Sequence, residues 1–359
     1  MFFKMRILVA PLNWGLGHAT RCIPIINTIL DLGYDPIIAG DGLSFEFLRS
    51  EFPDLTAYQL PHLNINYASS DFRKGMLRQS PEIVKSIFSD KYTIGKICKS
   101  FKVDGIISDS RMGCFNKGIP SVFLSHQINV MFGSGMMEKI MRKTFARLIR
   151  SFDEIWVPDY AGEDNLSGDL SHREMPLEVK YIGPLSRFER KIIPEKRELL
   201  VILSGPEPQR TLLESSIISQ LRKIEIEVKV VRGIPEKYTD DLPSNVTMLP
   251  LVKTDQLNEL ICSSKYVLCR AGYSSIMDLA KLRKKAILIP TPGQTEQEYL
   301  ATHLENYQHF HIQSQDDLDI PLGLESLANQ IHPKSKPPSQ SRGEDIITNW
   351  INGLTPRLG

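Results

Sequence analysis

A histidine that follows two closely spaced glycines is the first residue of this chain whose position suggests chemistry. His18 lies in the segment NWGLGHATR (residues 13–21), after an apolar run at 5–11 and before residues with helical spacing. The segment predicts a strand, a tight turn at Gly15 and Gly17, and a helix that begins near His18. Because the helix dipole keeps a histidine neutral there, His18 is suited to accept a proton from a substrate. A structural role at the start of the helix is the alternative.

Two further ionisable side chains end predicted strands in the same half of the chain. Residues 103–109 (VDGIISD) end at Asp109, and residues 119–126 (IPSVFLSH) end at His126. The carboxyl ends of parallel strands meet at one edge of a sheet, where open α/β folds bind ligands. Asp109 is thus expected to orient His18 or to act as the base itself, with a structural turn as the alternative. For His126 a buried, hydrogen-bonded histidine is one interpretation, and contact with a substrate is the other.

Residues 266–304 contain two successive patterns of strand, turn and helix. The first turn ends at Gly272 and is followed by Ser274 and Ser275, while the second turn has the sequence TPGQ at 291–294. Both helix N-termini should lie at the carboxyl edge of a parallel sheet. Their free backbone N–H groups and their dipoles favour the binding of a phosphate there.

A third turn, SGPEPQR at 204–210, follows the first predicted strand of this half. Gly205 allows the backbone to approach a ligand closely. Arg210 and Arg270 could add positive charge at a diphosphate. An ordinary turn, and arginines paired with surface acids, are the alternatives.

The pattern RAG-x-S-[ST]-x-x-[DE] at 270–278, a strand ending in P-x-P and then Q-x-E-Q resembles the donor-binding segment of GT-B glycosyltransferases of family 28. That family includes the lipid II-forming N-acetylglucosaminyltransferase and the galactolipid synthases. The resemblance implies that Gly272 meets a nucleotide-sugar, that Asp278 holds the ribose hydroxyls, and that Gln297, with Glu298 beside it, holds the sugar. Asp278 is shorter than the glutamate that the lipid II enzyme has at this place.

The loop at 15–18 (GLGH) is similar to the first loop of these enzymes, which commonly has G-x-G-H. The resemblance therefore places the acceptor on the first half of the chain, near Gly15, Gly17 and His126, with His18 or Asp109 as the catalytic base. The residues expected to hold the donor are Ser204, Gly205, Arg210, Arg270, Gly272, Ser274, Ser275, Asp278, Gln294, Gln297 and Glu298.

The fold expected from these observations is α/β, with two doubly wound Rossmann-like domains facing across a cleft (GT-B). The expected activity is inverting transfer from a UDP-sugar (UDP-GlcNAc or a UDP-hexose) to the hydroxyl of a glycan or lipid-linked acceptor. No metal is expected, because no Asp-x-Asp pair ends a predicted strand. No cofactor is expected besides the UDP-sugar co-substrate. Two alternatives remain open, a nucleotide-sugar 2-epimerase of the same fold and a non-catalytic nucleotide-sugar-binding protein.

A nicotinamide-dependent enzyme is a weaker alternative. Gly15 and Gly17 belong to a G-x-G-x-x-T pattern, and Asp41 follows at about the distance of a ribose-binding acid. The third glycine of the fingerprint is missing, however. A dinucleotide site would also leave the glycine turns of the second half unexplained.

The composition is that of a globular protein, with 42% hydrophobic and 24% charged residues among 359. The net charge of +1 gives no general reason to expect nucleic-acid binding. The five cysteines lack metal-ligand spacing, which favours free thiols in a reducing cytoplasm. A basic amphipathic pattern at 136–150 leaves open a peripheral contact with the inner face of the membrane, and a solvated helix packed on the core is the alternative.

The repeated strand-helix pattern divides the chain into an acceptor-binding domain at 1–185, a linker at 186–198 and a nucleotide-sugar-binding domain at 199–331. Residues 332–359 are expected to form a flexible segment and a C-terminal helix, which in GT-B enzymes crosses back to the first domain. The polar stretch 62–80 is expected to be an irregular loop near a site.

Overall fold

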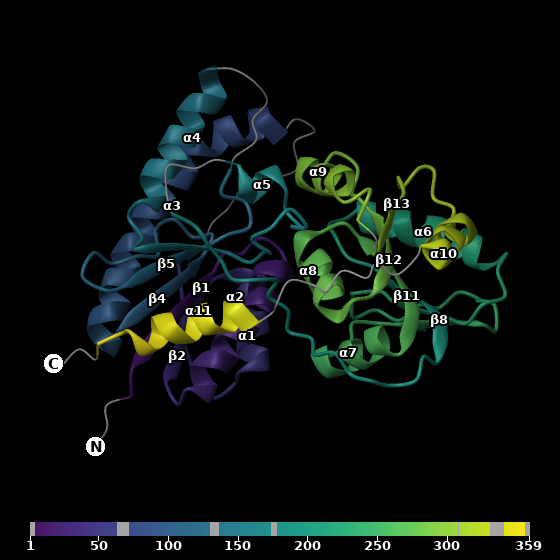
Figure 1. Cartoon of the computed structure of the whole chain (residues 1–359), viewed down its shortest axis with the longest axis horizontal. Coiled ribbons are helices and arrows are strands. Elements are labelled where there is room, and N and C mark those ends of the chain that lie inside the picture. Colours follow the sequence, from purple (N-terminus) through teal and green to yellow (C-terminus); the bar gives the residue numbers. More distant parts are fainter. Residues whose placement is uncertain are drawn as a thin grey trace. The chain divides into compact units, whose positions relative to one another are not determined.

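The computed structural model describes residues 4–62, 72–129, 136–173, 178–307, 309–330 and 341–355. The chain divides into two compact units, Met1–Leu185 with Pro337–Gly359 and Ser186–Lys336 (Figure 1). Each unit is built on a sheet whose paired strands run parallel, with helices in the connections. The predicted α/β class is confirmed.

The first unit contains, within the described residues, a seven-stranded sheet in the order β3-β2-β1-β4-β5-β6-β7. Its strands are β1 (Arg6–Pro11), β2 (Asp35–Gly40), β3 (Thr56–Gln59), β4 (Gly105–Asp109), β5 (Ser121–Leu124), β6 (Glu154–Val157) and β7 (Lys180–Tyr181). Its helices are α1 (Leu16–Asp31), α2 (Gly42–Glu51), α3 (Phe72–Phe101), α4 (Met136–Ile149), α5 (Asp169–His172) and α11 (Ser341–Asn352).

Strand β1 is almost continuously apolar because both of its faces are covered. Ile7 and Val9 belong to the hydrophobic cluster that includes residues of α1, whereas Leu8 and Ala10 belong to the cluster that includes residues of α3. Successive side chains of a strand point to opposite faces, so each face of the sheet needs its own helical layer.

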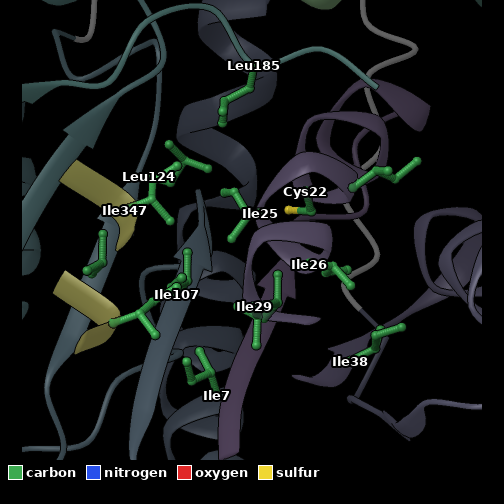
Figure 2. Close-up of a cluster of buried hydrophobic side chains, with 14 of the residues drawn as sticks. Ile7, Cys22, Ile25, Ile26, Ile29, Ile38, Ile107, Leu124, Leu185 and Ile347 are labelled. Carbon is green, nitrogen blue, oxygen red and sulfur yellow. The ribbon is translucent and has the colours of Figure 1, made fainter. Parts of the chain in front are cut away.

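The C-terminal helix α11 belongs to the first unit, as the resemblance implied. Ile347 of α11 lies in the same buried cluster as Ile25 of α1 and Leu124 of β5 (Figure 2). Trp350 packs edge-on against Trp156 of β6, with ring centroids 5.5 Å apart. The end of the chain therefore completes the core of its first unit.

The second unit contains, among the described residues, a six-stranded sheet in the order β10-β9-β8-β11-β12-β13. Its strands are β8 (Arg197–Ile202), β9 (Val228–Val231), β10 (Val246–Leu249), β11 (Ser264–Arg270), β12 (Lys285–Ile289) and β13 (Phe310–Ile312). Its helices are α6 (Gln209–Leu221), α7 (Thr254–Cys262), α8 (Tyr273–Leu282), α9 (Thr295–His303) and α10 (Ile320–Asn329). The segment 186–198, interpreted as a linker, is grouped with this unit, and β8 already begins at Arg197.

Two predicted irregular segments are partly helical. Residues 72–80 form the beginning of α3, so the expected loop at 62–80 is wrong over that part, and residues 63–71 lie outside the described residues. Residues 341–343 form the first turn of α11, whereas the rest of the expected flexible segment at 332–343 lies outside the described residues. Both corrections concern the first turn of a helix. Polar residues are common there, so the apolar spacing that indicates a helix is missing from the sequence.

Helix α4 packs on the core through Phe145 and Ile149, as the alternative interpretation of this basic segment expects. Its basic residues Lys143 and Arg147 are exposed, as is Arg150 directly after the helix. None of the helices in the described ranges is long and apolar enough to cross a bilayer. All five cysteines are buried free thiols.

Candidate functional site

Three strand ends meet at the carboxyl edge of the first sheet. In the pairing of β1, β4 and β5, Pro11 lies opposite Asp109, and Asp109 lies opposite Leu124. The loop after β1 leads into α1 through Gly15, whose φ of 69° is in the region that favours glycine. Ser44 of α2 donates hydrogen bonds to the backbone oxygens of Gly15 (3.1 Å) and Leu12 (3.3 Å), which hold this loop in place.

His18 lies in the first turn of α1, next to Asp109. Its Nδ1 is 3.0 Å from Oδ1 of Asp109, and its side chain is 12% exposed whereas that of Asp109 is fully buried. Within the described residues Nε2 has no hydrogen-bond partner. Gly17 is the second residue of the helix, and its carbonyl accepts a bond from the hydroxyl of Thr20 (3.0 Å). The fold thus brings the two predicted catalytic candidates into contact.

Arg21, which sequence reasoning did not select as a site residue, lies at the centre of this group. It lies one turn after His18 on α1 and is 3% exposed. Its Nε donates to Oδ2 of Asp109 (2.6 Å), and its Nη2 also bonds Asp109 through Oδ1. Nη1 donates to Nδ1 of His126 (2.8 Å), and Nη2 is 2.8 Å from Nδ1 of His18. The spacing of three residues between His18 and Arg21 was the available signal, since such residues share a helix face.

The charges of this group stabilise a carboxylate and a neutral imidazole. Burial is the largest influence on Asp109 and opposes ionisation, but Arg21 and His18 outweigh it and hold the pKa of Asp109 below its usual range. Burial and the positive charge of Arg21 lower the pKa of His18, against the opposite effect of Asp109. At neutral pH Asp109 therefore carries a charge and His18 does not.

His126 is buried in the first sheet's edge, as one of the two interpretations expected. Its Nδ1 accepts from Arg21, so its proton lies on Nε2 when the ring is neutral. His126 contacts the site through Arg21, and its role toward an acceptor stays a prediction.

The carboxylate of Asp41, considered above as a ribose ligand of a dinucleotide, has other partners. It is fully buried, forms an ion pair with Nη1 of Arg111 and lies 2.8 Å from Nδ1 of His62. Arg111 also holds Asp90 through two bonds of 2.8 and 3.0 Å. These contacts give Asp41 a structural role and provide no support for the nicotinamide alternative.

The predicted donor segments come together at the carboxyl edge of the second sheet. Strands β8, β11 and β12 are neighbours, with Cys269 opposite Ile202 and Arg270 opposite Ile289. The turns that follow these three strands therefore lie side by side. Gly205 has a φ of 103° with open space where a side chain would project, and Gly272 is the N-cap of α8.

The motif after β12 lies against the glycine turn after β11. A side chain added at Gly272 would come within 3.9 Å of Nε2 of Gln297. Gln297 is buried, accepts from the backbone N–H of Thr291 (2.9 Å) and donates to Oε1 of Gln294 (2.7 Å). The carboxylate of the exposed Glu298 accepts from the N–H of Gly293 (2.8 Å). Hydrogen bonds of Gln294, Gln297 and Glu298 thus hold the turn before α9 in place.

The serine hydroxyl groups predicted to contact the donor are free to bond a ligand. Ser204 is exposed, Ser274 and Ser275 are half-buried, and none of the three hydroxyls bonds to another described residue. Ser204 lies in the turn after β8, and Ser274 and Ser275 lie in the first turn of α8, where a diphosphate is expected.

The two arginines predicted on the donor side differ in whether a carboxylate compensates their charge. Arg210 is bound to Glu207 (2.7 Å) and Glu214 (3.2 Å), so its charge is compensated, and the idea that it adds positive charge at a diphosphate is not supported. The spacing of four residues to Glu214 was a signal for this pair. Arg270 is 1% exposed and donates to the carbonyl of Gln209 (2.7 Å).

Arg270 has no carboxylate partner in the described part of the chain, and its Nε is a buried atom without a hydrogen bond. Burial lowers its pKa to about 10, so the guanidinium remains charged at neutral pH. An uncompensated buried cation favours a nearby anion.

Asp278 lies on α8 and is bonded by the hydroxyl of Ser186. Burial raises its pKa to about 7, although Ser186 and the charges of Arg187 and Lys281 act in the opposite direction. The backbone oxygen of Ser186 accepts from Lys281 (3.4 Å). The predicted ribose ligand is therefore engaged with the first residue of its own unit, and its contact with ribose stays a prediction.

No cluster of three or more histidine, cysteine, aspartate or glutamate side chains that could hold a metal occurs among the described residues.

Comparisons with known proteins agree with this architecture. Residues 208–345 match the glycosyltransferase family 28 C-terminal domain. An uncharacterized glycosyltransferase of Methanopyrus kandleri is 20% identical over 96% of this chain and 94% of its own length. A Staphylococcus aureus relative, named as the UDP-N-acetylglucosamine--N-acetylmuramyl-(pentapeptide) pyrophosphoryl-undecaprenol N-acetylglucosamine transferase, is 19% identical over 87% of each chain.

Two solved structures cover nearly the whole chain. The MurG protein of Acinetobacter baumannii has a TM-score of 0.55 at 14% identity and covers 98% of this chain and 96% of its own. Spinosyn rhamnosyltransferase SpnG complexed with thymidine diphosphate has a TM-score of 0.64 at 13% identity, covering 98% and 97%. The protein is thus a glycosyltransferase of GT-B fold. Most of its second unit is similar to the C-terminal domain of glycosyltransferase family 28.

Proposed function

We propose that this protein transfers a sugar from a UDP-sugar to the hydroxyl of an acceptor, with inversion at the anomeric carbon and without a metal ion. The observation that carries the proposal is the carboxyl edge of the second sheet. There Gly205, Gly272 and Gln297 follow three neighbouring strands of the second unit, and residues 208–345 match the family 28 C-terminal domain. We assign the donor to this edge.

The diphosphate is expected to bind at the turns after β8 and β11. The start of α8 presents backbone N–H groups, whereas those of Arg210 and Thr211 in α6 already bond Pro206 and Glu207. The positive ends of both helix dipoles lie at this edge. The buried charge of Arg270 adds to this positive potential. These groups can stabilise the leaving diphosphate as negative charge develops on it, which is the task that a metal performs in other transferases.

The first unit supplies the base in this proposal. The carboxylate of Asp109 is held ionised by Arg21 and is fully buried, which makes it unsuited to take a proton from a substrate. His18 is neutral at physiological pH and has no protein partner at Nε2 among the described residues. We therefore assign proton removal to His18 and its orientation to Asp109. Direct attack of the activated hydroxyl on the anomeric carbon gives inversion.

The acceptor we propose is a glycan or a lipid-linked sugar, as the name of the Staphylococcus aureus relative gives for that protein. The exposed basic residues of α4 would then face the inner surface of the cytoplasmic membrane.

Donor binding is tested first, by thermal unfolding with UDP, dTDP and GDP in the presence and absence of EDTA. UDP should raise the melting temperature in both cases, because a ligand that binds only the native state stabilises it. Gly205→Asp places a negative charge at the proposed diphosphate site and should abolish the rise. Gly33→Asp is the matched control, since Gly33 is also a positive-φ glycine with open space, and lies in the first unit. If none of the nucleotides changes the melting curve, the donor assignment fails.

Turnover is tested with a panel of UDP-sugars, with and without glycan acceptors. Slow release of UDP without an acceptor, accelerated when the right acceptor is added, is the expected result. The anomeric configuration of the product, measured by NMR, checks inversion. A 2-epimer formed from the UDP-sugar alone would identify an epimerase, and binding without any product would identify a nucleotide-sugar-binding protein.

A further inference from the structure

We propose that Arg21 is a positioning residue for the base His18, because it fixes the plane of Asp109 and competes with Asp109 for one ring nitrogen of His18. This proposal rests on the assignment of His18 as the base of the proposed transferase. It adds a third residue to the pair of His18 and Asp109, and the packing of α1 against the ends of β4 and β5 brings that residue to them.

The guanidinium of Arg21 is fixed from three directions. Nε and Nη2 hold the two oxygens of Asp109, which is the bidentate geometry that arginine forms best with a carboxylate. Nη1 bonds Nδ1 of His126, which follows β5, and Nη2 is also 3.3 Å from the hydroxyl of Ser110. Since Arg21 is 3% exposed, these partners and not water determine its position.

Nδ1 of His18 has two partners that require opposite proton positions. It lies 3.0 Å from Oδ1 of Asp109 and 2.8 Å from Nη2 of Arg21. A carboxylate only accepts and a guanidinium only donates. When Nδ1 carries the proton it bonds Asp109, and when Nδ1 lacks the proton it accepts from Arg21.

Only one of these two tautomers can act as a base toward the acceptor. With the proton on Nδ1, Nε2 has a free lone pair and can take the proton of the acceptor hydroxyl. The acceptor oxygen then forms its bond to the anomeric carbon, the bond to the diphosphate breaks with its electron pair, and His18 becomes imidazolium. With the proton on Nε2, His18 cannot accept a proton there. The balance between Asp109 and Arg21 therefore sets the fraction of active enzyme.

The charge of Arg21 also acts on the imidazolium that the reaction forms. Among the described residues, the charged and titratable groups that act on His18 are Arg21 on its own helix, Asp109 at the end of β4 and His126 after β5. Arg21 disfavours the imidazolium and Asp109 favours it. Arg21 thus keeps His18 unprotonated to lower pH and helps it to release the proton after each turnover.

The experiment is NMR of the full-length protein with ¹⁵N-labelled histidine, with the His18 signals among those of the eight histidines assigned through His18→Gln. The ring nitrogen shifts report the tautomer, and their pH dependence reports the protonation of His18. Arg21→Met should raise the pKa of His18 and shift the neutral ring toward the Nδ1–H tautomer. Arg21→Lys keeps the charge but lacks the planar fork, so the pKa of His18 should stay close to the wild-type value.

Arg111→Met is the matched control. Arg111 is buried to the same degree as Arg21 and is paired with Asp41 and Asp90, but it does not bond His18. Its replacement should lower the melting temperature without moving the titration of His18. Unchanged titration and tautomer of His18 in both Arg21 variants would overturn the proposal. If Arg21→Met does not fold, a wild-type tautomer and wild-type turnover in Arg21→Lys would overturn it.

Kinetics give a second readout. Arg21→Lys should lower kcat by about 10²-fold, because a misplaced catalytic group costs about that factor, with KM for the UDP-sugar unchanged. The acidic limb of kcat/KM should move to higher pH in Arg21→Met and should not move in Arg21→Lys. If the wild-type protein transfers no sugar, the proposed function fails, whereas the NMR result still decides the contacts of Arg21.

Discussion

Replacing Asp278 with asparagine should stabilise the second unit most above neutral pH, and progressively less as the pH falls toward 4. Burial raises the pKa of Asp278 to about 7 from an ordinary value of 3.8. The folded protein therefore keeps a proton on this carboxyl that the unfolded chain has already lost. Between these two pH values the native state binds more protons, so the free energy of unfolding falls as pH rises.

The size of the effect follows from the pKa difference. About three pH units at roughly 1.4 kcal/mol each give a loss on the order of 4 kcal/mol, complete once the pH exceeds the pKa of the folded state. Relaxation around the ionised group reduces this value, so we expect about 1–4 kcal/mol. An asparagine can accept the bond from Ser186 and never ionises, so the Asp278→Asn variant should lack the loss.

Urea unfolding from pH 5 to pH 8.5 measures the prediction. All three tryptophans, Trp14, Trp156 and Trp350, lie in the first unit, so tryptophan fluorescence follows that unit and serves as an internal control. Far-UV circular dichroism follows both units. The wild type and Asp278→Asn should diverge with rising pH by dichroism alone. The same pH dependence in both proteins would refute the burial argument.

Ser186→Ala provides a second check on the same group. The bond from Ser186 lowers the pKa of Asp278, against the larger effect of burial. Its removal should therefore raise the pKa further, so that the loss of stability extends to higher pH and becomes larger. A shift to lower pH would contradict the assigned hydrogen bond.

Two further predictions concern the reaction itself. His18→Ala should reduce transfer by about 10²–10⁴-fold, the usual contribution of a general base, and Asp109→Asn should reduce it less if Asp109 only orients His18. UDP affinity, measured on the same variants, should be nearly unchanged because the proposed donor site lies in the other unit, and full activity in His18→Ala would exclude it as the base. Gln297→Ala should weaken the UDP-sugar by about tenfold, as expected for a lost hydrogen bond, and UDP much less. Equal loss of affinity for both ligands in titration calorimetry would remove Gln297 from the sugar pocket.

Much of the architecture could be predicted because it depends on local patterns. The alternation of apolar runs and helical spacing defined nearly every strand, and parallel pairing brings all the strand ends of a sheet to one edge. For this reason the contact between His18 and Asp109, 91 residues apart, followed from the positions of the two residues after their strands. The proximity of Gly272 and Gln297 followed in the same way.

Contacts of individual charged side chains could not be predicted in this manner. The bond between Ser186 and Asp278 joins residues 92 positions apart, and no periodic pattern links them. Arg21 was visible only as the last letter of the glycine-turn motif, since its partners are distant in sequence, with Asp109 at the end of β4 and His126 after β5. Strand β13 is three residues long, too short to give a periodic signal of its own.

The two sheet edges differ in how their charges are compensated, and this difference agrees with the roles proposed for them. In the first unit two buried carboxylates are paired with arginines, Asp109 with Arg21 and Asp41 with Arg111, and the group left facing outward at the edge is the neutral ring of His18. In the second unit Arg270 remains without a carboxylate partner among the described residues, beside two helix N-termini. A neutral hydroxyl needs a base without excess charge, whereas a leaving diphosphate needs positive potential. The distribution of buried charge thus supports the proposed acceptor and donor units by an argument that does not depend on the sequence motifs.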